Sequence, residues 1–175
     1  MEKPTRWIID NFLPEDELKI MEEILYSPAF AWNTMDVVYR GDPDQRMVHN
    51  VFQEDVVSDH YRLFRPILRE LKVEFILKAK INLDIKQKKT YKFHVDSPLF
   101  HKYNPAFLTG IFNFTDCNGG TLFKEDNKFI ESKRNRMVIF SSCFEHAGVC
   151  PTNETFRYGL NINWLGEKPV RGEKI

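Results

Sequence analysis

The spacing of apolar residues changes along the chain from a helical period to a strict alternation. In LPEDELKIMEEIL, Leu18, Met21 and Leu25 form one apolar stripe, which predicts a helix. A second helical pattern covers SDHYRLFRPILRELK, and Pro66 inside it is expected to kink or split the helix. Between them, NTMDVVYRGDPDQRMVHNVFQ is rich in turn residues and favours a flap or hairpin. We therefore expect a helical part over about residues 1–74.

Beyond this part, apolar and polar residues alternate almost without fault in FILKAKINLDIK. DCNGGT is expected to be a turn in which two glycines are free to take positive φ. Many short strands with regular turns predict a sandwich or barrel core over about residues 75–166, within one domain of residues 1–175. The helices would pack on the outer face of one sheet. Further strands are expected at 91–96, 108–115, 121–124, 136–141, 147–150 and 156–164.

Two of these strands carry polar residues on a face that should point inward. In FRYGLNINW, Arg157, Asn161 and Asn163 share a face with a glycine, opposite an apolar face that runs from Phe156 to Trp164. That polar face is typical of the lining of a wet pocket. In TYKFHVDSP, His94 and Asp96 likewise share one face of an expected strand.

An imidazole beside a carboxylate indicates a metal site. Two histidines and one carboxylate on one triangular face bind iron(II) and leave three positions open. His146 follows a buried strand and a short turn in RMVIFSSCFEHAG, so it is the candidate for the third ligand after His94 and Asp96. His101 lies too close to Asp96 to return on a neighbouring strand and is expected at the pocket rim or in a lid. Eleven residues after His146, Arg157 can hold a carboxylate through a two-pronged contact.

Composition excludes several other classes of protein. Lys and Arg together equal Asp and Glu at 25 each, so no broad basic face for nucleic acid is expected. No apolar segment approaches the ~20 residues of a membrane span, nor is a signal peptide evident, which favours a soluble cytoplasmic protein, in the host cytoplasm if a phage encodes it. The three cysteines do not form a disulfide framework.

Two cysteines, one charged segment and two histidines are not expected to take part in catalysis. Cys143 and Cys150 flank His146, but a structural zinc site would need a fourth ligand, and a thiol nucleophile would need an orienting group. ESKRNR, residues 131–136, is expected to be a solvated turn. His49 and His60 are expected at the surface.

The ordered set YKFHVD, CNGGTLF, RMVIFSSCFEHAG and FRYGLNINW resembles the 2-oxoglutarate- and iron(II)-dependent oxygenases. The layout is most similar to the prolyl 4-hydroxylase-like branch, in a short form of the kind that bacteria and phages encode. The resemblance implies a mainly β fold with N-terminal helices, built on a double-stranded β-helix, the jelly-roll barrel that cupins also use. It also implies that His94, Asp96 and His146 bind iron and that Arg157 pairs with the C5 carboxylate of 2-oxoglutarate.

Other residues are placed in the pocket by the same resemblance. Asn113 falls where prolyl hydroxylases often have a tyrosine that touches the C5 carboxylate, and Asn82 falls near another pocket position. Asn161 and Asn163 would point inward and contact cosubstrate or substrate. Because a small residue replaces the metal-binding carboxylate in halogenating relatives, Asp96 favours hydroxylation.

The implied reaction uses dioxygen to convert 2-oxoglutarate to succinate and carbon dioxide while a C–H bond is hydroxylated, with ascorbate as a candidate reductant. The substrate would be a prolyl residue in a peptide or protein, although related enzymes act on small molecules. A flap over residues 37–51 and a lid over 97–107 should form the entrance, with substrate contacts from Tyr39, Arg40, Phe100 and Tyr103. Two alternatives stay open: a cupin-like metal-dependent isomerase and a non-catalytic metal-binding barrel. Iron-dependent binding of 2-oxoglutarate would separate them from an oxygenase.

Overall fold

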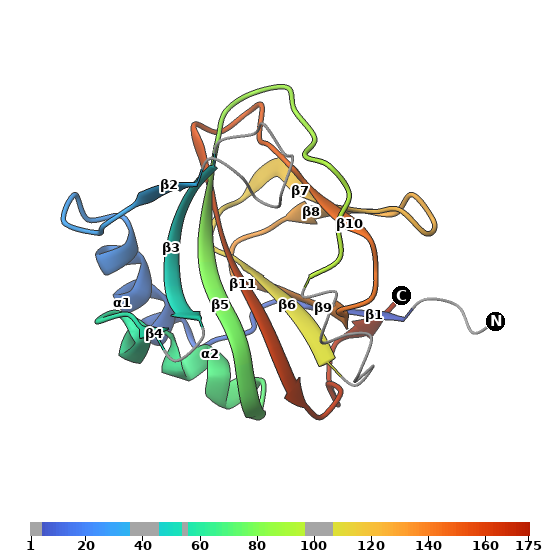
Figure 1. The fold of residues 1–175 in the computed structure, drawn as a ribbon, viewed down its shortest axis with the longest axis horizontal. Helices are drawn as coiled ribbons and strands as arrows, with labels where there is room; N and C mark the ends of the chain where they lie inside the picture. The colour runs from blue at the N-terminus through green and yellow to red at the C-terminus, as the bar shows by residue number, and fades with distance from the viewer. Residues whose placement is uncertain (1–4, 36–45, 54–55, 97–106) are drawn as a thin grey trace.

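The computed structural model describes residues 5–35, 46–53, 56–96 and 107–175, and the statements below concern these residues. Two antiparallel sheets face each other, and helices cover the outer side of the larger one (Figure 1). The large sheet runs in the order β12 (Glu173–Lys174), β1 (Arg6–Ile9), β9 (Arg136–Ser141), β6 (Phe107–Asn113), β11 (Phe156–Gly166), β5 (Val73–Ile85), β3 (Arg46–Gln53) and β2 (Asn33–Met35), with β4 (Val56–Val57) beside β3. The small sheet runs in the order β10 (His146–Val149), β7 (Cys117–Phe123) and β8 (Phe129–Ser132).

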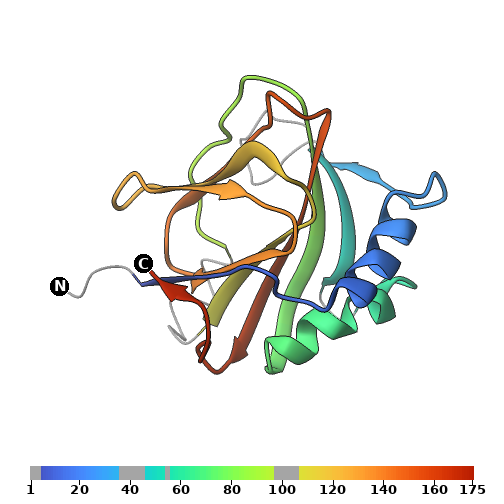
Figure 2. The same ribbon diagram turned by 180° about the vertical axis from the view of Figure 1, so that it is seen from behind.

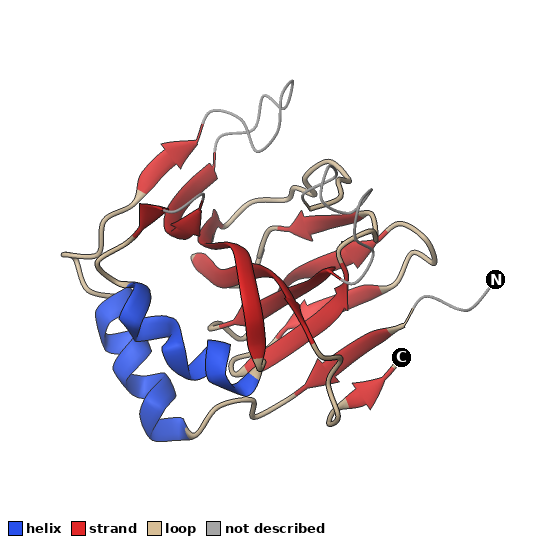
Figure 3. Cartoon of the chain, turned by 60° about the horizontal axis from the view of Figure 1, so that its bottom comes forward, coloured by secondary structure: helices blue, strands red, loops and turns tan. Residues whose placement is uncertain are grey.

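The helices form a separate layer, seen from behind in Figure 2 and in blue in Figure 3. Helix α1 (Glu15–Leu25) buries Leu18, Met21 and Leu25 as predicted, and acidic residues in its first turn complement the helix dipole. Pro66 splits the second helical segment, as predicted, into the 3₁₀ helix η1 (Tyr61–Phe64) and α2 (Arg65–Glu70). Among the described residues, no helix has the length and apolar character needed to cross a membrane.

Alternation along β5 and β11 separates the apolar core from the interior of the barrel. Ile81, Leu160 and Trp164 lie in the cluster that packs against the helices. The polar residues between them therefore point toward the small sheet. The apolar face of β11 was expected to lie in the core along its whole length, but Phe156, at the first position of the strand, is 41% exposed, so for this residue the expectation is wrong.

The first third of the chain contains strands as well as helices. Strand β1 pairs with β9, and β3 pairs with β5, so both extend the large sheet. The segment RWII is too short to show a clear period, and the turn residues before β3 favoured a flap, which is why the sequence pattern missed them. The helical description of residues 1–74 is thus incomplete.

The glycine pair in DCNGGT lies inside a strand rather than at a turn. Gly119 and Gly120 belong to β7, and among the described glycines only Gly172 has a positive φ. A side chain on Gly119 would reach within 2.7 Å of the carbonyl oxygen of Val149, and one on Gly120 would collide with the carbonyl of Ile130. The glycines are needed because neighbouring backbone approaches closely, not because of their φ freedom.

His49 is buried, and the expectation that it lies at the surface is wrong. Its Nδ1 lies 2.8 Å from the carbonyl oxygen of Ala31, and its Nε2 lies 2.7 Å from Ser58 Oγ. His60 is partly buried and stacks on Phe30. Both rings help to attach the 3₁₀ helix to the segment after α1.

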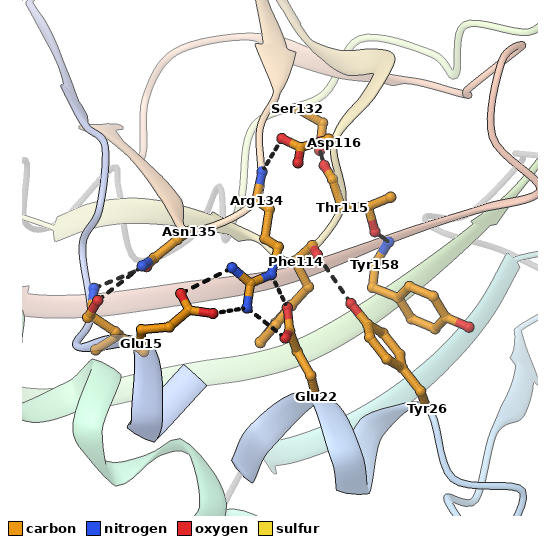
Figure 4. A network of polar contacts seen from close by, with 11 residues as sticks. Glu15, Glu22, Tyr26, Phe114, Thr115, Asp116, Ser132, Arg134, Asn135 and Tyr158 are labelled. Carbon is orange, nitrogen blue, oxygen red and sulfur yellow. Dashed lines mark hydrogen bonds and ion pairs between the residues drawn. The ribbon is translucent and has the colours of Figure 1, made fainter. Parts of the chain in front are cut away.

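The turn at residues 131–136 is also less solvated than expected, because it attaches α1 to the barrel (Figure 4). Arg134 forms ion pairs with Glu15 and Glu22 of α1 at 2.8 and 2.7 Å. Asn135 exchanges two hydrogen bonds of 2.9 Å with the backbone of Leu13 and has a φ of 62°. Its short polar side chain makes this left-handed conformation less costly.

We expect Asn135→Ala to lower the free energy of unfolding by about 2–4 kcal/mol, because two buried hydrogen bonds are lost and an alanine must take a positive φ. Urea denaturation would measure the change. Asn135→Gly is the matched control, since it loses the same bonds but tolerates the backbone, so it should cost about 1 kcal/mol less. Equal stability of wild type and the alanine variant would refute this role of the turn.

Candidate metal centre and adjoining pocket

The segment over residues 90–96 runs beside β10, but it is not the continuous strand that the pattern predicted. It makes two isolated bridges, Thr90 with Val149 and His94 with His146. The backbones of His94 and His146 exchange two hydrogen bonds of 3.0 and 2.9 Å. Directly opposed residues of an antiparallel pair project to the same side, so the two imidazole rings lie together with centroids 4.7 Å apart.

Each ring is oriented by a backbone carbonyl. Nδ1 of His94 lies 3.1 Å from the oxygen of Lys92, and Nδ1 of His146 lies 3.0 Å from that of Phe144. Because a carbonyl can only accept, each Nδ1 carries the proton and each Nε2 presents a lone pair. Burial, with His146 adjacent, lowers the pKa of His94 to about 4, so this ring is neutral at neutral pH.

Asp96 completes the group and is held by the large sheet. Its carboxylate lies 3.7 Å from Nε2 of His94 and 3.6 Å from Nε2 of His146. Oδ2 accepts hydrogen bonds from Asn161 at 3.0 Å, Asn163 at 3.1 Å and, more weakly, Thr109 at 3.4 Å. Burial alone would raise the pKa of Asp96, but the two histidines and Asn161 lower it well below its usual range.

The donor set fits an iron(II) ion. One ligand atom from each of His94, Asp96 and His146 lies within 4.8 Å of the others. Ligands about 2.1 Å from a shared ion lie roughly 3.0–3.4 Å apart. The two His–Asp distances are within a few tenths of an ångström of that range, whereas the most widely separated pair would have to approach by up to roughly 1.4–1.8 Å, which rotation of the side chains can supply. Three protein ligands from one side leave the opposite side open. No other group of this kind occurs among the described residues, and Cys143 and Cys150 are free thiols outside it, which removes support for zinc at that place.

The pocket that begins at this centre ends in a buried charge cluster. Arg157 Nη1 donates to Asp84 Oδ2 at 2.7 Å. Arg46 Nε lies 3.0 Å from Asp84 Oδ1, in a geometry too poor for a hydrogen bond, so charge holds this second pair. All three side chains are buried, Asp84 with only 1% exposed. Two guanidinium groups share one carboxylate, which leaves positive charge for a further anion.

Arg46 falls in the segment that was expected to be an entrance flap, but the structure places it in the pocket. It comes from β3, and its guanidinium stacks on the ring of Tyr91 with 3.8 Å to the centroid. Gly148 leaves room for it, because a side chain there would reach within 2.8 Å of Arg46 Nη2. Burial alone would lower the pKa of Arg46, but Asp84 raises it, so the guanidinium stays charged.

The amides assigned from the sequence take different places in the pocket. Asn113 Oδ1 accepts from Arg157 at 3.3 Å, and its Nδ2 donates to backbone carbonyls, so it supports the arginine. Asn161 and Asn163 point inward as expected and donate hydrogen bonds to Asp96. Asn82 lines the pocket, and its buried Oδ1 lacks a hydrogen-bond partner among the described residues. Tyr39, Arg40, Phe100, Tyr103 and His101 lie outside the described residues.

The register of β5 against β11 orders the pocket from the metal centre to the arginines. Asn161 faces Lys80, Gly159 faces Asn82, and Arg157 faces Asp84 across the two strands. The sequence held a signal for Lys80 and Asp84, since they share the strand face on which Asn82 was assigned to the pocket. Thr109 carried no comparable signal. The pocket thus offers candidate metal ligands at one end and cations at the other.

Asp84→Asn should lower the free energy of unfolding by about 3–5 kcal/mol, because two buried guanidinium groups lose their carboxylate. Asp10→Asn is a matched control: Asp10 also lies between two cations, Arg136 and Lys133, but at the surface, and such pairs contribute about 0–1 kcal/mol. Urea denaturation of both variants would give the comparison. Similar losses for the two variants would contradict the proposed burial of this charge cluster.

No family model and no curated protein matches the chain, but solved structures do. A 2OG-Fe(II) oxygenase family oxidoreductase from Burkholderia pseudomallei superposes with a TM-score of 0.68 at 11% identity, covering 91% of this chain and 85% of that one. A Trichoplax adhaerens prolyl hydroxylase, solved with a peptide of hypoxia inducible factor, gives 0.61 at 15%, covering 91% and 83%. A Pseudomonas putida prolyl-4-hydroxylase gives 0.61 at 16%, covering 93% and 92%. The predicted jelly-roll architecture is confirmed, and the chain has the fold of the 2-oxoglutarate- and iron(II)-dependent oxygenases.

Proposed function

We propose that the protein is an iron(II)- and 2-oxoglutarate-dependent dioxygenase that hydroxylates an unactivated C–H bond. One observation carries the proposal: the Nε2 atoms of His94 and His146 converge with the Asp96 carboxylate at one end of a pocket, and two buried arginines close its other end. A molecule with a chelating group and a distal carboxylate matches both ends. 2-Oxoglutarate has both groups.

Each pocket residue has a definite task in this proposal. His94, Asp96 and His146 would hold iron(II). Arg157 and Arg46 would bind the C5 carboxylate and so select a cosubstrate of the right length. When bound, iron(II) and 2-oxoglutarate would supply oxidative decarboxylation, in which one oxygen atom of dioxygen enters succinate and the other enters the substrate. Asn161, Asn163 and Thr109 would keep Asp96 in place as a ligand. A retained carboxylate at Asp96 supports hydroxylation over halogenation.

We extend the proposal to a prolyl residue in a peptide or protein as the substrate. The similar solved structures include two prolyl hydroxylases, one of them bound to a peptide. A viral collagen prolyl hydroxylase from Paramecium Bursaria Chlorella virus-1 also superposes, with a TM-score of 0.58. Tyr39, Arg40, Phe100 and Tyr103 stay the proposed substrate contacts, and ascorbate the proposed reductant. Proline-containing peptides that gain one oxygen atom in mass spectra would support this substrate class.

Anaerobic addition of iron(II) and then 2-oxoglutarate to metal-free protein should produce the weak visible charge-transfer band of the chelate. Asp96→Ala should abolish or strongly weaken the band, because one of three protein ligands is lost. Arg157→Ala should weaken 2-oxoglutarate binding roughly 10- to 150-fold, the equivalent of about 1.5–3 kcal/mol for a hydrogen bond to a charged group. Titration of the band would measure both effects.

Arg69→Ala serves as the control, since Arg69 is an exposed residue of α2 whose ion pairs, with Glu17 of α1 and with Glu70, lie in the helical layer away from the pocket. It should leave the titration unchanged. Metal binding without a band in the wild-type protein would instead favour a cupin-like isomerase or a non-catalytic metal-binding barrel.

A further inference from the structure

Lys80 is a buried cation that the contacts described so far do not explain. Its side chain lines the pocket and the residue is only 6% exposed. Within the described parts of the chain, its ammonium group makes neither a hydrogen bond nor an ion pair. Buried lysines are rare unless they are paired. An anion that enters the pocket would provide the missing partner.

The position of Lys80 tells which end of the pocket it serves. It lies on β5 opposite Asn161, the residue that donates to the metal-binding carboxylate of Asp96 at 3.0 Å. The arginine end lies four residues further along the same strand, at Asp84, roughly 13 Å away at about 3.3 Å per residue. Of the charged pocket groups, Asp96 affects the pKa of Lys80 more than Arg46 or Asp84 does, which agrees with a position nearer the metal centre.

The burial of Lys80 is unfavourable in the absence of a ligand. Desolvation, with the like charge of Lys78 next in size, lowers the pKa of the ammonium to about 7. An uncharged side chain of similar length would avoid this cost. A residue that weakens the fold and faces a binding site is expected to act on the ligand.

We propose that Lys80 binds the C1 carboxylate of the 2-oxo acid, next to the metal, while Arg46 and Arg157 bind the distal carboxylate. The inference rests on the proposed function and adds a residue that the family resemblance did not predict. Lys80 lies on a central strand, between β3 and β11, so it forms part of the pocket floor. A floor position suits the buried cosubstrate better than an entering substrate. Each carboxylate of 2-oxoglutarate would then have its own cation.

Two truncated ligands separate the ends of the pocket. Levulinate keeps the oxo group and the distal carboxylate but has a methyl group in place of the C1 carboxylate. 2-Oxobutyrate keeps the C1 carboxylate and the oxo group but lacks the distal carboxylate. We would measure the affinity of the manganese(II)-loaded protein for 2-oxoglutarate by calorimetry. The affinities of the two truncated ligands would be measured by their displacement of bound 2-oxoglutarate, because a competition experiment still measures weak binding.

Lys80→Met should weaken 2-oxoglutarate and 2-oxobutyrate about tenfold or more, the range of a charge-assisted contact, and leave levulinate unchanged. Arg46→Met should give the opposite pattern and weaken 2-oxoglutarate and levulinate only. Lys80→Arg should restore part of the affinity for the C1 carboxylate. A second readout excludes a merely structural role: ligand-free Lys80→Met should melt at the same or a higher temperature than wild type.

Three results would overturn the assignment. Wild-type affinity of Lys80→Met for 2-oxoglutarate would show that the amine does not touch the cosubstrate. Equal weakening of levulinate and 2-oxobutyrate would place its effect on the metal or the fold. Unchanged cosubstrate binding with a loss of coupled turnover would assign the amine to an acidic group of the substrate. If wild-type protein binds no 2-oxoglutarate at all, the proposed function itself fails, which is a distinct outcome.

Discussion

The site depends on one pair of backbone hydrogen bonds between residues 52 positions apart in the chain. His94 and His146 each donate to the other's carbonyl, and this exchange sets the distance and direction of both imidazole rings. The carbonyls of Lys92 and Phe144 then fix the tautomers by accepting from Nδ1. The side chains need little further guidance, because backbone geometry already directs both Nε2 atoms toward Asp96.

The pocket floor is made at some cost to stability. Arg46, Asp84 and Arg157 form a buried charge cluster on the large sheet. Lys80 lies on the same strand as Asp84, toward the metal centre, and has no partner among the described residues. Apolar residues of similar volume would pack in these places more favourably. The excess of positive charge is understandable if a dianion belongs there. The buried positive charge of the ligand-free protein therefore indicates that the ligand is an anion.

Much of the fold and part of the site could be predicted because alternation along a strand states which residues share a face. This rule predicted that Arg157 points inward on β11. The helices were expected on the outer face of one sheet. It failed where the local pattern was short, as in β1, or where turn residues preceded a strand, as in β3. Arg46 was therefore assigned to an entrance flap instead of the pocket. The roles of Asn161 and Asn163 could not be predicted either. Which amide reaches Asp96 depends on strand register, which one sequence does not state.

The site is divided between two sheets, and this division has a mechanical consequence. Both histidines stand on the small-sheet side, whereas the arginines and Lys80 stand on the large sheet. The position of the histidines relative to the arginines therefore depends on how the two sheets pack, as well as on the separation along β5 and β11. An apolar cluster joins the two sheets and consists of Ile111, Phe123, Ile130, Val138 and Phe140. Phe140 also packs edge-on against His146, with centroids 4.8 Å apart. Because this cluster lies between the sheets, a change in its volume would shift the histidines relative to the arginines even though no pocket residue is altered.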